Sequence, residues 1–130
     1  GMLIWSPLAG GFLTGKYRRG QTRPVNARRS NTDGNFLQFD EKIGFNIIEE
    51  LDKIANEHQA TVSQAALNYL LRKPAVSSIV VGARTSDQLK DIVKTSDWMM
   101  TSDEVKRLDE TSKPPRIYPY WMQDFMRNER

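Results

Sequence analysis

The sequence predicts a parallel α/β fold, and the order of its patterns is the reason. Two short apolar runs, at 3–5 and 77–81, each lead into a loop, and helical patterns lie between and after them. The second run is rich in β-branched residues and does not alternate with polar ones, which is typical of a parallel strand buried on both faces. Strand, helices, strand, helices is the order of two successive βα units. We therefore expect one domain over residues 1–130.

Residues 1–17 predict a strand followed by a glycine-rich loop. The apolar run Leu3-Ile4-Trp5 is stopped by Ser6 and Pro7, and Pro7 prevents a central strand from continuing. Residues 18–39 are rich in Arg, Asn, Gly, Ser and Thr and show little periodicity. They predict a long irregular loop, and loops of that length are usually functional or mobile.

Residues 40–73 predict two helices. Apolar residues recur at steps of three and four in the first helix, at Ile43, Ile47, Leu51, Ile54 and Ala55. Thr61 and Gln64 predict a capping box at the start of the second helix. Apolar residues nearly encircle that helix between 65 and 71, so we expect it to be the more buried of the two.

The second half of the chain predicts a strand over 76–83, two helices over 85–112 and an aromatic tail over 113–130. Gly82 closes the strand, and Thr101 with Glu104 predicts a second capping box. The tail holds several large apolar side chains. We expect these to cover a surface of this chain or of a partner, since such groups are rarely left in water.

Composition excludes several classes of protein. The apolar fraction of 38% and the charged fraction of 27% are those of an ordinary globular protein rather than of a disordered chain. The chain has no cysteine, which excludes disulfide frameworks and thiolate metal sites and fits a reducing cytoplasm. No apolar run approaches the ~20 residues needed to cross a bilayer. We therefore expect a cytoplasmic protein without a membrane segment.

The positive charge is concentrated near the start of the chain. Residues 1–32 contain no acid and six bases, Lys16, Arg18, Arg19, Arg23, Arg28 and Arg29. A basic loop of this kind either neutralises phosphates or is simply solvated, and its position beside the glycine-rich segment favours a nucleotide as the ligand. Nucleic acid is the weaker alternative, because the basic residues are not interleaved with aromatic stacking groups.

Two segments have the character of phosphate-binding loops. In each, a short apolar run turns into a loop of small residues, where backbone amides have room to approach an anion, and a cation follows. No nucleophile, metal cluster or acid–base pair accompanies them, so we predict no metal site and no catalytic residue. The single histidine, His58, lies in a polar break between helices without a neighbouring acid, which favours a surface residue over a catalytic one.

These two segments also carry a resemblance to a known family. Trp5-Ser6-Pro7-Leu8-Ala9-Gly10-Gly11 with Thr14-Gly15-Lys16-Tyr17 resembles the seventh strand and following loop of the aldo-keto reductases, in the branch that includes potassium-channel beta subunits and bacterial oxidoreductases. Val81-Gly82-Ala83-Arg84-Thr85 with Gln88-Leu89 resembles the eighth strand and the next helix. The resemblance implies the C-terminal fragment of a (β/α)8 TIM barrel: the last two βα units, the terminal helix and the tail, with about two short parallel strands.

The same resemblance implies an NADP(H) site at the C-terminal ends of these strands. One group of residues would lie along the nicotinamide and pyrophosphate, namely Ser6, Pro7, Leu8, Ala9 and Gly10, with Lys16 adding a charge. Gly82, Arg84 and Gln88 would hold the adenosine 2′-phosphate and ribose, which favours NADP over NAD. Asp91 is the implied adenine contact, although the family's following Asn is replaced here by Ile92, which cannot hydrogen-bond a purine.

The resemblance also implies what this chain lacks. Aldo-keto reductases reduce carbonyls with an Asp, Tyr, Lys and His set carried by earlier strands, and this sequence has no match for it. We therefore expect an NADP(H)-binding portion that is not active alone. The alternative is a non-catalytic module for oligomerisation or partner binding.

Two strands leave open edges and bury little apolar area, so a partner is expected. The candidates are a homo-oligomer and the missing N-terminal half of the barrel. Phe36, Phe39, Trp98 and the aromatic tail are the side chains expected to cover the exposed surfaces.

Overall fold

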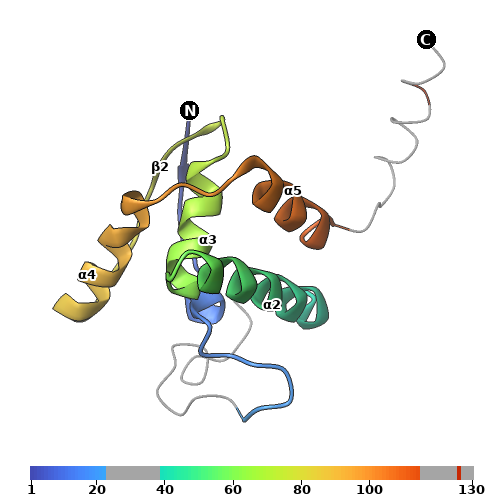
Figure 1. The fold of residues 1–130 in the computed structure, drawn as a ribbon, viewed down its shortest axis with the longest axis horizontal. Coiled ribbons are helices and arrows are strands. Elements are labelled where there is room, and N and C mark those ends of the chain that lie inside the picture. Colours follow the sequence, from blue (N-terminus) through green and yellow to red (C-terminus); the bar gives the residue numbers. More distant parts are fainter. Residues whose placement is uncertain (23–38, 115–125, 127–130) are drawn as a thin grey trace.

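The computed structural model describes residues 1–22, 39–114 and 126 (Figure 1). The predicted aromatic tail over 113–130 falls outside the described residues except at 113, 114 and 126, and Phe36 and the loop residues 23–38 lie outside them as well. Along the chain the elements are β1 (Met2–Ile4), the 3₁₀ helix η1 (Ala9–Thr14), α2 (Glu41–Glu57), α3 (Val62–Leu71), β2 (Val76–Ile79), α4 (Ser86–Val93), the 3₁₀ helix η2 (Lys94–Asp97) and α5 (Ser102–Thr111).

The two strands pair in parallel, as the sequence predicts. Leu3 lies opposite Ser78 and Ile4 opposite Ile79, with an irregularity between Met2 and Leu3. Helix α3 packs against β2 and connects to it through a tight turn at 72–75. Because the strands run the same way, the loops that follow them leave the sheet at the same edge.

The prediction that the second strand is buried on both faces is wrong. The strand ends at Ile79 rather than at residue 83, and Ser77, Ser78 and Val80 are exposed while Val76 and Ile79 are half-buried. Helix α3 covers one face, and no second layer covers the other within the described part of the chain. A run of β-branched residues therefore indicates that a strand is suited to being buried, but it does not show which layers cover that strand in this chain.

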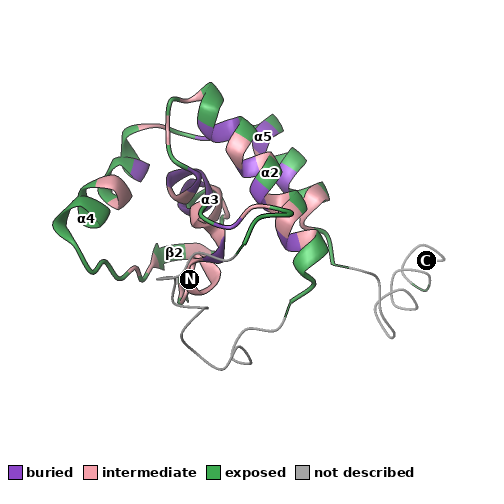
Figure 2. Ribbon diagram, turned by 90° about the horizontal axis from the view of Figure 1, so that it is seen from below, coloured by how far each residue is buried: buried purple, intermediate pink, exposed green. Residues whose placement is uncertain are grey.

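The hydrophobic core lies between α2, α3 and α5 (Figure 2). The largest fully buried side chains of the described residues are Leu51, Ile54, Leu67, Met100 and Leu108, together with Ile48, which packs with Phe12 and Tyr17 instead. Helix α3 is buried at most positions from Val62 through Asn68, which confirms that it is the more buried of the two central helices. Of the face predicted for α2, Leu51, Ile54 and Ala55 are buried in this core and Ile47 packs against it, whereas Ile43 is only half-buried.

Threonine side chains start three of the helices. Thr61, Thr85 and Thr101 each accept a hydrogen bond from the backbone N–H three residues later. At Thr101 the capping box is complete, because the Glu104 carboxylate accepts the Thr101 N–H at 2.6 Å. At Thr61 only half of the predicted box forms, since the Gln64 side chain bonds to Asp91 instead.

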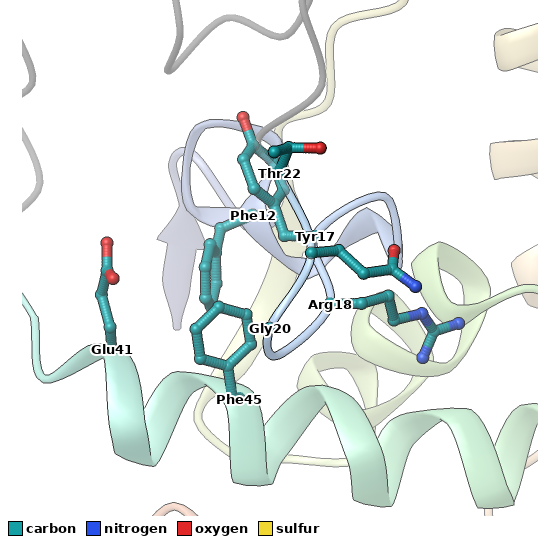
Figure 3. A pocket seen from close by; sticks show the side chains of 8 residues that line it. Phe12, Tyr17, Arg18, Gly20, Thr22, Glu41 and Phe45 are labelled. Atoms are coloured by element: carbon teal, nitrogen blue, oxygen red, sulfur yellow. The ribbon is translucent and has the colours of Figure 1, made fainter.

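An aromatic cluster attaches the first loop to α2. The Phe12 ring contacts Tyr17, Phe39 and Phe45 at centroid separations of 5.4, 4.7 and 5.4 Å. Gly44 allows this approach, because a Cβ there would lie 2.7 Å from Phe12 Cε1. A small cavity of about 200 Å³ lies beside the cluster, with Arg18, Gly20, Thr22 and Glu41 around it (Figure 3). Phe39, which is expected from the sequence to cover a surface left exposed by the absent strands, packs on Phe12 within the chain.

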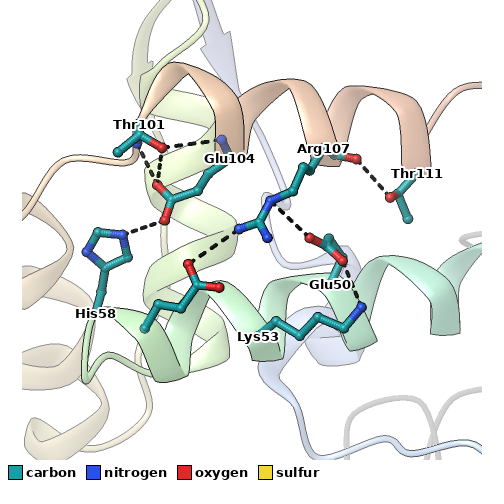
Figure 4. A network of polar contacts seen from close by, with 8 residues as sticks. Glu50, Lys53, His58, Thr101, Glu104, Arg107 and Thr111 are labelled. Carbon is teal, nitrogen blue, oxygen red and sulfur yellow. Dashed lines mark hydrogen bonds and ion pairs between the residues drawn. The ribbon is translucent and has the colours of Figure 1, made fainter.

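A polar network joins the end of α2 to the start of α5 (Figure 4). The His58 imidazole lies 2.7 Å from the Glu104 carboxylate and stacks on Trp98 at 4.3 Å between centroids. Burial raises the pKa of Glu104, but hydrogen bonds from Thr101 and His58 outweigh it, so the pKa is below its ordinary value. His58 thus has an acid partner, contrary to the sequence prediction, because that partner is 46 residues away. Trp98 likewise packs on the chain itself.

Candidate functional site

The two predicted loops begin side by side in space. The N–H of Val80 donates to the carbonyl of Ile4 at 2.9 Å, at the end of the paired residues of the strands. Residues 5–17 and 80–88 therefore diverge from one edge of the sheet. In parallel α/β proteins this edge, at the carboxyl ends of the strands, is where ligands bind.

An open cavity of about 810 Å³ lies between these loops. The sequence-predicted site residues that line it are Ser6, Pro7, Leu8, Gly10, Lys16, Gly82, Arg84, Gln88 and Asp91. Ala9 alone among the predicted residues does not line it. The structure thus brings the two separate sequence motifs to one cavity, and its volume is within the usual range for small-molecule and cofactor sites.

The first loop is shaped by left-handed backbone conformations. Gly10 and Gly11 have φ of 66° and 93°, and the non-glycine residues Ser6 and Ala9 have φ of 52° and 49°. Such angles are costly for residues with a Cβ and concentrate where function fixes the backbone. The turn is held by hydrogen bonds from the Ala9 N–H to the Ser6 carbonyl and from the Gly11 N–H to the Leu8 carbonyl. Ala9 therefore contributes to the shape of the loop rather than to the cavity wall.

The second loop ends in the N-terminus of α4. The Thr85 hydroxyl accepts the Gln88 N–H at 3.2 Å, and the Gln88 side-chain carbonyl accepts the Arg84 N–H at 2.9 Å. These two bonds close a small ring around residues 84–88, the α4 cradle. They leave the Gln88 NH2 group without a partner among the described residues. The cradle therefore presents a donor, a guanidinium and a helix N-terminus on one side of the cavity.

The two cavity cations differ from the other basic residues of the first loop. Lys16 and Arg84 are exposed and make no ion pair within 1–22 and 39–114. Arg18 pairs with Asp52 at 2.8 Å and Arg19 pairs with Glu49 at 3.0 Å, both on α2. The prediction of one basic loop facing an anion is therefore wrong for these two arginines, because α2 neutralises them. Arg23, Arg28 and Arg29 lie outside the described residues.

Asp91 lines the cavity, but its carboxylate is already engaged. It accepts hydrogen bonds from the Gln64 side-chain amide at 2.8 Å and from the Thr61 hydroxyl at 3.0 Å. The start of α3 thus forms a third wall of the cavity, with Thr61 and Ser63 lining it. Sequence reasoning missed this wall. The only signal for it was the capping threonine, which indicated a helix start and not its place in the fold.

Further residues line the cavity beyond the predicted set. Trp5 and Tyr17 belong to the first motif and were not assigned roles, while Asp87 and Ile92 lie on α4. The Asp87 side chain is 93% exposed and lies 4.0 Å from the Lys90 ammonium. His58 is not among the lining residues. In the described part of the chain no cluster of three or more histidine or acidic residues could hold a metal ion.

Comparison with known proteins gives consistent matches. The model of the aldo/keto reductase family matches residues 1–113. A putative voltage-gated potassium channel subunit beta of Schizosaccharomyces pombe is 34% identical over 116 residues, covering 85% of this chain and 33% of that protein. The L-glyceraldehyde 3-phosphate reductase of Escherichia coli O157:H7 is 27% identical over 113 residues, with coverage of 85% and 33%. The chain thus spans about a third of the length of these curated relatives.

A solved structure is similar as well. The glycerol dehydrogenase of Gluconobacter oxydans has a TM-score of 0.67 and 28% sequence identity, and the match covers 90% of this chain and 36% of that one. Its fold is a (β/α)8 barrel. The predicted fold class, a part of such a barrel that is rich in helix and has two short parallel strands, is confirmed.

Proposed function

The chain belongs to the aldo-keto reductase family, and we propose that it forms the NADP(H)-binding portion of an oxidoreductase of that family. The parent reaction would be NADPH-dependent carbonyl reduction. One observation carries the proposal: the two motifs, about seventy residues apart in the sequence, line one open cavity. Each contributes to that cavity a glycine and a cation that has no ion pair among the described residues, as the phosphates of a dinucleotide require.

The first loop would hold the nicotinamide and pyrophosphate. Its wall residues are Ser6, Pro7, Leu8 and Gly10, with Ala9 fixing the turn. A Cβ on the neighbouring Gly11 would meet no atom within 4 Å, so the loop is open on that side. Lys16 would add a charge to the pyrophosphate.

The α4 cradle would hold the adenosine 2′-phosphate and ribose. Gly82 leaves open space, with nothing within 4 Å of where its Cβ would lie, and Arg84 provides a guanidinium that forks onto phosphate oxygens. The N-terminus of α4 adds the positive end of the helix dipole. These donors favour NADP over NAD. Asp91 would stand beside the adenine as part of the wall, and its neighbour Ile92 would offer an apolar contact rather than a hydrogen bond.

Binding, and not turnover, is the role proposed for the chain alone. Bound NADPH supplies a hydride, but reduction of a carbonyl also requires a proton donor beside the nicotinamide. The family's Asp, Tyr, Lys and His set has no match in this sequence. His58 is engaged by Glu104 and Trp98 and does not line the cavity. The chain's own residues would therefore bind and orient the cofactor.

Titration with NADPH and NADH, followed by Trp5 fluorescence, tests this proposal. Trp5 lines the cavity and is 67% exposed, so a bound nicotinamide would quench it. Arg84→Ala should weaken NADPH by about tenfold or more and NADH much less, because a charge-assisted hydrogen bond to the 2′-phosphate is lost. Arg72→Ala removes an exposed arginine outside the cavity and serves as the matched control. A folded protein that binds neither cofactor at about 1 mM, some 4 kcal/mol of affinity, would contradict the proposal.

A second candidate function is assembly, as a homo-oligomer or with the remainder of a barrel. The observation that favours it is the uncovered strand region, where Leu3 and Trp5 are 71% and 67% exposed and Met2 and Val80 are 51% and 53% exposed. An apolar group of this kind usually marks an interface. Light scattering separates the cases, since a mass equal to one chain with cooperative unfolding contradicts the homo-oligomer.

None of the described helices is long and apolar enough to cross a membrane. Separately, we propose a cytoplasmic location, because a sequence without cysteine fits a reducing compartment.

A further inference from the structure

Helix α4 carries half of the proposed cofactor site but is weakly anchored. None of its residues is buried, and Leu89 and Val93 are 51% and 60% exposed. Its polar contact with α3 is made at Asp91, whose carboxylate receives hydrogen bonds from Gln64 and Thr61. An element with so little buried surface depends on its few specific bonds for its position.

Gln64 is the buried member of this contact. It is 5% exposed, and its side-chain amide donates to one Asp91 oxygen at 2.8 Å while its backbone N–H is capped by Thr61. Gln64 does not line the cavity, whereas Asp91 and Thr61 do. The hydrogen bond to Asp91 is therefore the direct link between the Gln64 side chain and the cavity wall.

A continuous set of bonds leads from Gln64 to the α4 cradle. Asp91 lies about one helical turn after Gln88, and the Gln88 side-chain carbonyl holds the backbone of Arg84. Rotation or translation of α4 would move the guanidinium of Arg84 and the NH2 group of Gln88 together. The first loop is held separately, through the aromatic cluster on α2, so a shift of α4 would leave it in place.

We propose that Gln64 is a positioning residue that sets the place of the α4 cradle and thereby the preference for a 2′-phosphorylated nucleotide. This inference rests on the proposed function. In this inference Asp91 has two roles: it lines the cavity, and its hydrogen bonds hold α4 against the start of α3. It also explains why half of the predicted capping box is absent: the Gln64 side chain has turned away from the Thr61 backbone to bind Asp91.

The test uses Gln64→Glu in the full chain. This substitution replaces the donor with a second carboxylate beside Asp91, and like charges repel. We expect the ratio of the NADH to the NADPH dissociation constants to fall by roughly tenfold, the effect of losing one hydrogen bond to a charged group. NADH should lose less affinity than NADPH, because the first loop is untouched and NADH has no 2′-phosphate for Arg84 to hold. The pair 2′,5′-ADP and 5′-AMP should show the same loss of preference.

The double variant Q64E/D91N provides a rescue. It exchanges donor and acceptor, because the amide introduced at position 91 would donate to the carboxylate introduced at position 64, while the carbonyl of that amide still accepts from Thr61. The preference for NADPH should return most of the way to that of the wild type. Ile54→Val, which trims a fully buried side chain on α2, is the control for lost stability alone. If Gln64→Glu does not fold, Gln64→Met removes the donor without adding a charge. The same ratio of NADH to NADPH dissociation constants is then measured for that variant.

The outcomes are distinguishable. The positioning role is overturned if Gln64→Glu leaves the preference for NADPH unchanged. It is also overturned if the variant lowers the affinities for NADPH and NADH by the same factor, as a general loss of stability would. Either result leaves the proposed function standing. A folded wild type that binds neither nucleotide overturns both. A lower ratio that the double variant restores supports the inference, and a lower ratio that it leaves unrestored overturns the role of the Gln64–Asp91 bond.

Discussion

The side of the molecule built from α2, α3 and α5, the core side, differs sharply from the side built from β1, β2 and α4, the cavity side. The fully buried side chains of the described residues belong to the core side or to the turn before α5. The cavity side has no buried residue in either strand or in α4. It carries instead the left-handed backbone of the first loop, the cavity cations Lys16 and Arg84 and the open cavity.

This contrast shows how the chain separates stability from binding. Helices with a shared apolar stripe can be stabilised by burial alone, so the core side is satisfied within the chain. The cavity side keeps its polar donors free and its backbone approachable, which yields little stability. We therefore expect changes on the core side to alter unfolding and changes on the cavity side to alter ligand binding.

The largest expected effect is in the core. Leu67→Ala, at a side chain with no exposed surface, should lower the free energy of unfolding by about 2–5 kcal/mol, measured by urea denaturation. Leu3→Ala on the strand region is the matched leucine control and should cost less than about 0.5 kcal/mol. An equally large loss at Leu3 would remove the contrast between the two sides, because it would mean that the cavity side is covered in solution.

Two glycines offer a smaller contrast of the same kind. Gly44→Ala would place a Cβ 2.7 Å from the buried Phe12 ring and 2.9 Å from Phe39, and should destabilise the fold by about 1–3 kcal/mol. Gly82→Ala has open space and should leave stability within about 0.5 kcal/mol while weakening NADPH, since it lies on the cavity wall. Thermal unfolding with and without NADPH measures both. Equal destabilisation by the two variants would be inconsistent with two distinct sides.

The smallest expected effect is the loss of folding stability at acidic pH that comes from Glu104. The pKa of Glu104 in the folded chain is below its ordinary value of 4.5, so its contribution to stability is present above that pH and is lost as the pH falls towards the folded value. Glu104→Gln should cost about 1–2 kcal/mol at about pH 7, through the hydrogen bonds of a charged group, and less at about pH 3, which lies below the ordinary pKa of 4.5. Urea denaturation at both pH values measures this.

Glu110→Gln, exposed on the same helix, is the control and should show little change at either pH. The Glu104→Gln variant should still lose some stability as the pH falls, because the hydrogen bond from Lys73 also lowers the pKa of Asp109. A pH profile identical in wild type and Glu104→Gln would contradict the assignment.

Local patterns predicted the elements well, because they depend on neighbours in sequence. The threonine caps, the parallel strands and the buried face of α3 follow from spacing and hydrogen-bond chemistry within a few residues. The two motifs likewise anticipated the lining of one cavity, except at Ala9, whose positive φ is a property of the turn.

Contacts across tens of residues could not be predicted in the same way. The partner of His58 is 46 residues away, and that of Gln64 is 27 residues away. The pairing of Arg18 and Arg19 with α2 depends on where the first loop turns back. The exposure of β2 depends on which layers are present, and its composition carries no information about that.

Our main proposal is that both loops hold one dinucleotide, and hydrogen–deuterium exchange with and without NADP⁺ is the decisive measurement. We expect residues 6–11 and 82–88 to gain protection together at the same NADP⁺ concentration, while α2 and α5 exchange as before. Protection of one loop without the other, or of neither in a folded chain at saturating NADP⁺, would contradict it.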